Sequence, residues 1–339
     1  MKNMFSYHLS NYFTKYLSAQ RNLSINTIQS YRDTFMLFLE FLSEAKEIQP
    51  NKVKLTDITY ENINSYLDWL ESNRNVKKSS RNVRLAAIHS FVKYLQIHDI
   101  DHIYEYQKIL SIKSKKHHTR EIPYLSVKEI KAIINAPDIA TINGRRDKVL
   151  LTLLYDTGAR VDELIHLKCS DIRIDNPATV TLHGKGKKTR VVPIMGNTVK
   201  ILKDYIDEHN FIQLKNTSME VLFNNHHKKQ FTRAGISYII NKYVEIVNKK
   251  EDIQIKIKVH PHTFRHSKAV HLLEAGVELI YIRDILGHSS VKTTEIYAKV
   301  CTKNKRDALE KAYIEVTKTE LPNWDEDKEL ISWLQDLCK

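Results

Sequence analysis

The spacing of apolar residues predicts a helical region over the first third of the chain. Between about residues 5 and 110, apolar positions recur with the period of a helix and little strand pattern is present. Helices are expected to begin near Thr27, near Thr59 and after Ser80, where polar residues can cap them. We therefore predict a small helical domain over residues 1–112.

The third of these predicted helices has an apolar side and a basic side. The apolar side carries Val83, Ala87, Phe91, Val92 and Leu95. The basic side carries Arg81, Arg84 and Lys93. Arg81 and Arg84 are accordingly candidates for binding a polyanion.

A polar, cationic segment without periodicity follows from Ile112 to Arg120. Such a segment is typical of a linker, and we place the boundary between two domains at residues 113–119. A solvated charge run is the ordinary interpretation of this composition. Because both flanking regions are basic, contact of Lys113, Lys115 and Lys116 with phosphates is the alternative interpretation.

The second region, residues 120–320, is predicted to be helical with one small β-hairpin or sheet. Ser126 opens a capping-box pattern, and a buried helix covers 149–155. Between about 171 and 194 the apolar period drops to two, so strands are expected around a basic turn at 183–188. Gly287 ends one helix, and another runs through Tyr297.

Composition sets broad limits on the class of protein. The length of 339 residues exceeds what one hydrophobic core usually supports, so two domains are expected. No apolar run approaches the roughly 20 residues that span a bilayer, and the first residues lack a signal-peptide pattern. Cys169, Cys301 and Cys338 form no CxxC pair, which fits a reducing compartment. We expect a cytoplasmic protein without a membrane partner.

The charge favours a polyanionic partner without deciding it. Lys and Arg number 53 against 40 Asp and Glu, which gives a net charge of +13. Nucleic acid is one partner of such a chain. Abundant Lys, Ile and Asn are also typical of proteins from AT-rich genomes, and this composition alone raises the isoelectric point. The motifs have to decide.

Four separated segments combine residue types that core packing does not require. Arg160 follows Gly158 at a predicted turn and has Glu163 three positions on, where an ordinary surface ion pair would also be found. His262 and Arg265 share one helix face, so a phosphate-gripping guanidinium meets a group that can move a proton. His288 lies in a tight corner. Tyr297 is one of 17 tyrosines, most of which simply pack.

Taken in order, these segments resemble the tyrosine recombinases, or phage integrase family, including the Xer-type recombinases. The matching stretches are TGARVDEL at 157–164, GKGKKTRVVPI at 184–194, HPHTFRH at 260–266 and LGHSSVKTTEIYAKV at 286–300. Ala159 departs from the larger apolar residue common in the family. Residues 5–110 resemble the family's helical, SAM-like core-binding domain more loosely.

The resemblance implies a role for each matching residue. Arg160 and Arg265 would hold the non-bridging oxygens of the scissile phosphate, with Glu163 supporting the arginines. Lys185 would protonate the leaving 5′-oxygen, and Lys187 beside it on the same turn would contact DNA. His262 would act as base or acid toward the tyrosine, and His288 would donate a hydrogen bond to the phosphate. Tyr297 would attack and form a phosphotyrosine ester.

The same resemblance implies a site-specific recombinase that closes as a two-domain clamp on double-stranded DNA and works as a homotetramer. Cationic side chains would neutralise the phosphate, so neither a metal nor any other cofactor is expected, and the ester would store the bond energy without ATP. The task would be integration, excision or transposition of a mobile element, with Xer-type dimer resolution as the alternative. A tail helix at 321–339 either closes its own domain or docks on a neighbouring protomer.

Two other classes of protein compete with this interpretation. A metal-dependent nuclease could use the many histidines, yet no compact carboxylate cluster or HExxH accompanies them. A DNA-binding regulator without catalysis would explain the charge and the helices. It would not require Arg160, Lys185, His262, Arg265, His288 and Tyr297 in this order.

Overall fold

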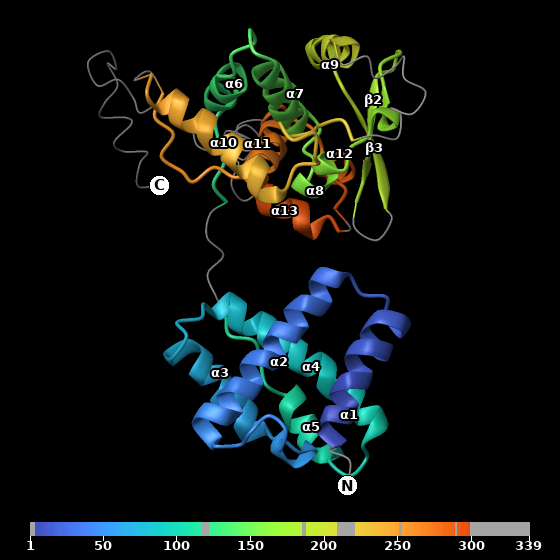
Figure 1. Ribbon diagram of the computed structural model, residues 1–339, viewed down its shortest axis with the longest axis vertical. Coiled ribbons are helices and arrows are strands. Elements are labelled where there is room, and N and C mark those ends of the chain that lie inside the picture. Colours follow the sequence, from blue (N-terminus) through green and yellow to red (C-terminus); the bar gives the residue numbers. More distant parts are fainter. Residues whose placement is uncertain are drawn as a thin grey trace, which may run out of the picture. The chain divides into compact units, whose positions relative to one another are not determined.

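The chain divides into two compact units, Met1–Arg120 and Glu121–Lys339. The computed structural model, shown in Figure 1, describes residues 4–116, 122–184, 188–208, 221–250, 253–288 and 290–298. Each unit has its own hydrophobic core. The predicted mainly helical fold with a small antiparallel sheet is confirmed. None of the helices described is long and apolar enough to cross a membrane.

Helices make up the regular structure of the first unit. They are α1 (Met4–Asn11), a π-helical stretch (Tyr12–Gln20), α2 (Ile25–Lys46), a 3-10 turn (Leu55–Asp57), α3 (Tyr60–Ser72), α4 (Lys78–His98) and α5 (Ile103–Leu110). Helix α3 begins after the predicted cap Thr59, whose hydroxyl accepts the backbone N–H of Asn62 at 3.1 Å. Helix α2 begins slightly earlier than predicted, because Ser24 accepts the N–H of Thr27 and supplies the cap.

Aromatic rings fill the core of the first unit. The ring of Phe91 on α4 lies 5.0 Å from those of Phe35 on α2 and Tyr12 in the π-helical stretch, in edge-to-face geometry. Such pairs contribute beyond the area they bury. The aromatic side chains of Phe35 and Phe38 on α2 are accordingly buried in this core.

The first turn of helix α4 departs from the predicted faces, whereas Ala87, Phe91, Val92 and Leu95 are buried as predicted. Arg81 is 4% exposed, whereas Val83 is 50% exposed. Arg81 lies one turn before the buried Leu85 and therefore points inward, with its Nε 3.8 Å from the carboxylate of Glu71. The prediction that Arg81 lies on an exposed basic face is wrong, and its guanidinium is not presented to a polyanion.

The second unit is a helical assembly that carries one small sheet. Its elements are α6 (Val127–Asn135), α7 (Ile142–Asp156), α8 (Val161–Ile165), a 3-10 turn (Cys169–Asp171), β1 (Ile172–Arg173), β2 (Thr179–His183), β3 (Thr189–Pro193), α9 (Gly196–Glu208), α10 (Arg233–Asn248), α11 (Pro261–Glu274), α12 (Leu279–Leu286) and α13 (Lys292–Ala298). The predicted capping box is confirmed at α6, where Ser126 and Glu129 satisfy each other's backbone N–H groups.

The sheet has the strand order β1-β2-β3, and both pairings are antiparallel. Val180 pairs with Val192, and both side chains are buried, as is Leu182. The predicted period of two is thus confirmed, because alternate side chains of β2 face the core. His183 pairs with Thr189, so the predicted hairpin turn lies between them.

Helix α11 lies in the middle of the second unit and contacts α7, α10, α12 and α13 (Figure 1). Helix α12 in turn contacts β3. Residues that are far apart in sequence, from 158 to 297, therefore meet around one buried helix. This arrangement positions the site described below.

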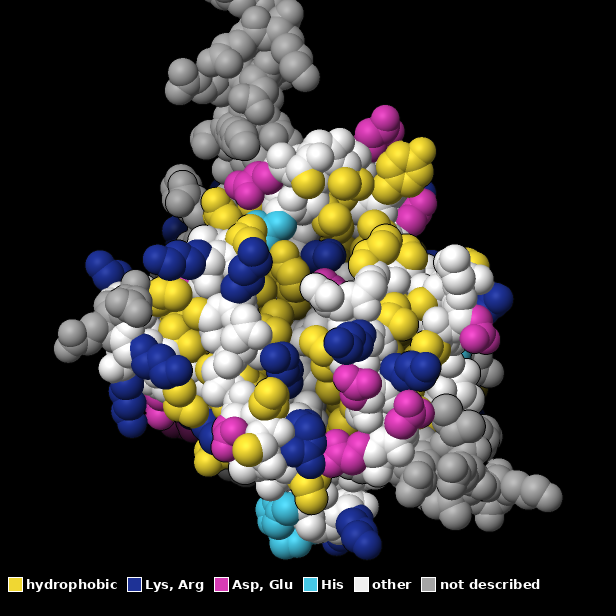
Figure 2. All heavy atoms as spheres, turned by 90° about the horizontal axis from the view of Figure 1, so that it is seen from above, with side chains coloured by type: hydrophobic (Ala, Val, Ile, Leu, Met, Phe, Trp, Pro, Cys, Tyr) yellow, Lys and Arg dark blue, Asp and Glu magenta, His cyan; other side chains and the backbone are white. Residues whose placement is uncertain are grey.

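Charge is distributed over the surface of the second unit rather than confined to the site. On the face seen in Figure 2, Lys and Arg side chains are interspersed with acidic and apolar ones. The net charge of +13 alone therefore does not locate a functional surface. The buried and hydrogen-bonded cationic side chains indicate the position of a functional site better than the net charge does.

Candidate active site

A sharp turn between α7 and α8 positions the first arginine. Gly158 has φ +56°, which favours glycine, and a Cβ there would lie 2.7 Å from the Leu286 side chain and would have to displace it. Arg160 precedes α8, and its backbone N–H donates to the Glu163 carboxylate at 2.7 Å. Its guanidinium donates to the same carboxylate at 2.9 Å and to the carbonyl of Gly287 at 3.2 Å.

The second arginine is buried inside the unit. Arg265 on α11 is 3% exposed, and its guanidinium donates to the carbonyl oxygens of Gly158 and Leu286. Burial, with the nearby charges of Arg160 and Arg190, lowers the pKa of Arg265 to about 9. Arg265 therefore joins the turn before α8 to the end of α12 and still carries its charge near neutral pH.

The corner after α12 positions His288. Gly287 ends the helix with φ +63°, as predicted for a left-handed cap. The Nδ1 atom of His288 lies 2.9 Å from the hydroxyl oxygen of Thr294. Burial, with the charges of Arg265, Arg160 and Arg190, lowers the pKa of His288 to about 4. The imidazole is therefore neutral at pH 7 in the DNA-free chain.

Tyr297 on α13 is both a packed residue and a candidate nucleophile. Its side chain is 1% exposed and lies in a small apolar cluster with Val270, Ile282 and Leu286. Its ring is stacked against His288, with centroids 6.4 Å apart and planes 15° apart. Burial raises the pKa of its hydroxyl, while the charges of Arg265 and Arg160 act in the opposite direction.

The hydrogen-bond partner of the Tyr297 hydroxyl is His266, a residue that the sequence analysis did not assign. The hydroxyl oxygen and Nδ1 of His266 are 2.9 Å apart. Burial and the neighbouring His262, His260 and Arg265 lower the pKa of His266 to about 4, so it is neutral at pH 7. A neutral imidazole can accept a hydrogen bond from a phenol.

His262, the histidine predicted to act on the tyrosine, lies one helical turn before His266. The two rings are 6.2 Å apart. Burial, followed by the charge of Arg265, lowers the pKa of His262. The assignment of His262 as base or acid stays a prediction, because the histidine that contacts the Tyr297 hydroxyl is His266.

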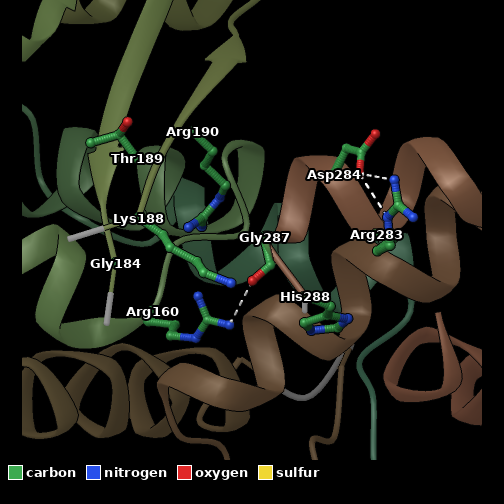
Figure 3. Close-up of a pocket in the computed structure, with 9 residues that line it drawn as sticks. All are labelled: Arg160, Gly184, Lys188, Thr189, Arg190, Arg283, Asp284, Gly287 and His288. Atoms are coloured by element: carbon green, nitrogen blue, oxygen red, sulfur yellow. Dashed lines mark hydrogen bonds and ion pairs between the residues drawn. The ribbon is translucent and has the colours of Figure 1, made fainter. Parts of the chain in front are cut away.

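An open pocket of about 540 Å³ lies at this junction of elements. Its lining residues are Arg160, Gly184, Lys188, Thr189, Arg190, Arg283, Asp284, Gly287 and His288. Figure 3 shows the side chains of Arg160, Lys188 and Arg190 gathered beside the Gly287 carbonyl, with His288 on the adjoining corner. Guanidinium, ammonium and imidazole groups converging in one pocket are suited to bind and stabilise a phosphate.

Several predicted residues lie outside this arrangement or outside the described residues. Lys185 and Lys187 lie outside the described residues, so both assignments stay predictions. Lys188, which the sequence analysis left unassigned, lines the pocket instead. The sequence shows several lysines close together in this segment, but it does not indicate which of them lines the pocket.

The other residues predicted to contact DNA differ in exposure and in whether other protein groups already bind them. Lys113 and Lys116 are exposed. Lys115 is held by Glu71, with Nζ and Oε2 2.5 Å apart, and Asn82 hydrogen-bonds both backbone groups of Lys115. Arg84 donates to the carbonyl of Ser30 at 2.9 Å. Arg84 and Lys115 thus have structural partners that a phosphate would have to replace.

A metal site is a separate question, and the described part of the chain offers little for one. Among these residues, no group of three or more His, Cys, Asp or Glu side chains is arranged to hold a metal ion. The histidines of the site instead face arginines, which repel cations. The chemistry available here is that of cationic donors, neutral imidazoles and a phenol.

Comparison with known proteins decides the family. The phage integrase family matches residues 123–304, which is more than half of the chain, and its N-terminal SAM-like domain matches residues 11–97. The chain belongs to the phage integrase family. It is a tyrosine recombinase, as the motifs between Gly158 and Tyr297 predicted.

Relatives of this tyrosine recombinase cover nearly its whole length. A Sinorhizobium fredii protein named as an integrase/recombinase is 33% identical over 303 residues, covering 89% of this chain and 90% of that protein. Tyrosine recombinase XerD of Staphylococcus epidermidis is 31% identical over 293 residues, covering 85% of this chain and 92% of that protein. Named relatives thus include both an integrase and a Xer recombinase.

Solved structures confirm the fold of the tyrosine recombinase. The XerH recombinase in a post-cleavage complex with its difH substrate has a TM-score of 0.67 at 22% identity, covering 85% of this chain and 80% of that one. The Tn1549 transposon integrase in complex with transposon right-end DNA has a TM-score of 0.65 at 15% identity, covering 88% and 97%. At these identities the likeness establishes the fold.

Proposed function

We propose that this tyrosine recombinase cleaves and rejoins double-stranded DNA through a 3′-phosphotyrosine intermediate. The Tyr297 oxygen attacks a backbone phosphorus, the bond to the 5′-oxygen breaks, and the phosphate becomes esterified to the phenol. The Tyr297 proton passes to a neighbouring imidazole, and Lys185 gives a proton to the leaving 5′-oxygen. Attack by the 5′-hydroxyl of another strand reverses these steps and needs no ATP.

One observation carries the proposal. Arg160 and Arg265, from the turn before α8 and from α11, both donate to backbone carbonyls at the end of α12, those of Gly287 and Leu286, and the Leu286 side chain packs in the same buried cluster as Tyr297. Phosphoryl transfer places negative charge on the equatorial oxygens, and preorganised cationic donors stabilise that charge. Arg160 and His288 also line the pocket in which a phosphate would lie.

The partner implied by this chemistry is duplex DNA carrying a specific site. We propose residues 1–112 and 120–320 as the two halves of a DNA clamp, with 113–119 as the linker and 321–339 as a tail helix. Strand exchange needs two sites and two nucleophiles on each, so the assembly is a homotetramer. Phosphate contacts would supply most of the affinity, and binding should weaken steeply as salt rises.

Mobile-element integration, excision or transposition is the task that we propose first. The relative named as an integrase/recombinase, at 33% identity, supports it. Xer-type resolution of chromosome dimers is the second candidate, supported by the 31% identical XerD. The two differ in where the cleaved sites lie, at element ends or at one chromosomal site.

Covalent capture tests both levels of the proposal. Cells producing the full chain are lysed in denaturant, DNA linked to the protein is isolated, and the attached ends are sequenced. The wild type should yield discrete sites in excess EDTA, and Tyr297→Phe should yield none while it still binds the captured sequence. Equal capture by Tyr297→Phe, or loss of capture in EDTA, would contradict the mechanism. The positions of the sites distinguish the two tasks.

A further inference from the structure

Arg190 on β3 makes three hydrogen bonds that converge on the pocket. Its Nη1 and Nη2 atoms donate to the two oxygens of Glu163, each at 2.8 Å, and its Nε donates to the carbonyl of Ile285 at 2.8 Å. The side chain is 10% exposed. A two-point arginine–carboxylate pair of this kind fixes orientation as well as charge.

The same carboxylate also holds Arg160. Glu163 is 4% exposed and accepts the backbone N–H and the guanidinium of Arg160. The Glu163 carboxylate therefore joins the start of α8 to strand β3, and Arg190 joins this pair to the end of α12 through the Ile285 carbonyl. In Figure 3, Arg190 lies beside the strands and Arg160 lies nearer the Gly287 carbonyl, to which a dashed line joins it.

Arg190 also packs against the corner that leads to His288. A Cβ at Gly287 would lie 2.9 Å from Cδ and 3.1 Å from Nη1 of Arg190. The Gly287 carbonyl in turn accepts a hydrogen bond from Arg160. The arginine thus touches the supports of two predicted phosphate ligands, Arg160 and His288.

An anchored support matters because Arg160 is only half-buried. Its side chain is 36% exposed and has several rotatable bonds, so Arg160 would sample many orientations without fixed partners. Misplacement of a catalytic group by about 1 Å can cost on the order of 100-fold in rate. Glu163 can hold Arg160 only while it is ionised and correctly oriented.

We propose that Arg190 is a positioning residue for phosphoryl transfer: it keeps Glu163 charged and aimed, and through Glu163 and Gly287 it sets the geometry of Arg160. This inference rests on the proposed function. The residues facing the Glu163 carboxylate are Arg190 from β3 and Arg160 before α8, with the charge of Arg265 from α11 close by. A structural role alone would give stability to the fold without tuning the reaction.

The pH profile of cleavage separates these two roles. Burial alone would raise the pKa of Glu163, but hydrogen bonds and charge from Arg190, and then from Arg160, hold it below its ordinary value. Without Arg190 the Glu163 carboxylate stays buried but loses the hydrogen bonds and charge that stabilise its ionised form, so Glu163 takes up a proton at a higher pH. As the solution is acidified, the variant without Arg190 should therefore lose cleavage activity at a higher pH than the wild type does. The reason is that a protonated Glu163 no longer holds Arg160 by an ion pair.

The experiment measures single-turnover cleavage of a captured DNA site by the full chain. Arg190→Gln should bind this DNA like the wild type, cleave it about 100-fold more slowly and lose activity at higher pH. Arg190→Lys, which keeps a charge, should recover part of the rate. The double variant Arg190→Gln/Glu163→Gln has no carboxylate to protonate at this position. Its cleavage rate should therefore not show the fall at low pH that Arg190→Gln alone shows.

Arg233→Gln is the matched control. Arg233 makes the same two-point pair with Asp162, next to Glu163 in sequence, but on the surface, with distances of 2.6 and 2.5 Å. This variant should match the wild type in rate and pH profile. A wild-type rate and profile in Arg190→Gln would overturn the inference. If Arg190→Gln unfolds, a folded Arg190→Lys with wild-type rate and profile would overturn it equally.

A second readout needs no reaction at all and so separates this inference from the proposed function. In the DNA-free chain, NMR of the Arg160 Nε–H group should show a restricted guanidinium in the wild type and Arg233→Gln. The same group should be more mobile in Arg190→Lys or Arg190→Gln. Absence of any wild-type adduct would contradict the proposed function alone, whereas unchanged Arg160 mobility would contradict the positioning role.

Discussion

The hydroxyl of Tyr297 lies 2.9 Å from Nδ1 of His266, four residues beyond the histidine predicted to act on it. Because the pKa of His266 is lowered to about 4, its imidazole is neutral at pH 7 and can accept a hydrogen bond from the phenol. Burial raises the pKa of Tyr297 itself, so the nucleophile needs such a partner. The contact makes His266 a candidate for the proton acceptor in the reaction.

We expect His266→Asn to slow cleavage more than His262→Asn if the observed contact persists on DNA. Asparagine keeps an acceptor near the position of Nδ1 but has no basicity. A general base typically contributes about 100-fold or more, so a loss of that order is expected for His266→Asn. Single-turnover rates on a captured site would show it. A larger loss in His262→Asn, with His266→Asn near normal, would return the role to His262.

Acid should destabilise the second unit before its carboxylates are protonated. His266 and His288 have folded-state pKa values of about 4, below the value of about 6.5 expected when unfolded. The unfolded chain therefore binds more protons between those pH values, and stability falls as the pH drops through this window. Thermal unfolding from pH 7.5 to 5 should show it. A His266→Asn/His288→Asn double variant should show a weaker dependence; an identical slope would contradict the burial argument.

Replacing the two arginines should have separable effects. Arg265 is buried and holds two backbone carbonyls, and hydrogen bonds from charged groups contribute about 1.5–3 kcal/mol each. Arg265→Ala should therefore lose stability and activity together. Arg160→Ala, at the half-exposed position, should lose about 100-fold or more in cleavage with a smaller change in unfolding free energy. Chemical denaturation and cleavage rates measure both; normal cleavage by the two variants would refute the phosphate-clamp assignment.

The two lysines of the hairpin can be distinguished by the leaving group. Lys185 is the predicted acid, whereas Lys188 lines the pocket. A DNA substrate with sulfur in place of the scissile 5′-oxygen releases a thiol, whose pKa of about 8.5 removes the need for protonation. The Lys185→Ala variant should cleave normal DNA slowly and the sulfur substrate at close to the wild-type rate. The cleavage rate of Lys188→Ala should not recover on the sulfur substrate. Restoration of Lys188→Ala instead would move the acid to Lys188.

Local motifs in the sequence were sufficient for the parts of the fold that local chemistry determines. The left-handed Gly287 that ends α12 and the alternation around Val180 and Val192 all follow from short-range rules, and the structure has them. The Arg160–Glu163 pair was also foreseen, because residues three apart share a helix face. The helical period placed Ala87 and Leu95 of α4 correctly in the core, but not the first turn, where Arg81 is buried and Val83 is exposed.

Short-range sequence rules do not predict the contacts between segments that are far apart in the chain. Arg190 reaches Glu163 across 27 positions, and nothing in its alternating strand pattern marks it as more than a surface residue. His266 stands directly after the predicted Arg265, and its role became visible only when α13 was placed against α11. In both cases the deciding information is the packing of elements, which brings polar groups together away from water.

The most direct test of the account is to identify the residue that carries the DNA. Trypsin cleaves after Lys292 and after Lys299, so it should release the segment 293–299 of the captured adduct, in which Tyr297 is the tyrosine. After nuclease digestion, mass spectrometry should find a 3′-linked nucleotide on Tyr297. A nucleotide on any other residue, or on the other end of the broken strand, would contradict the central claim.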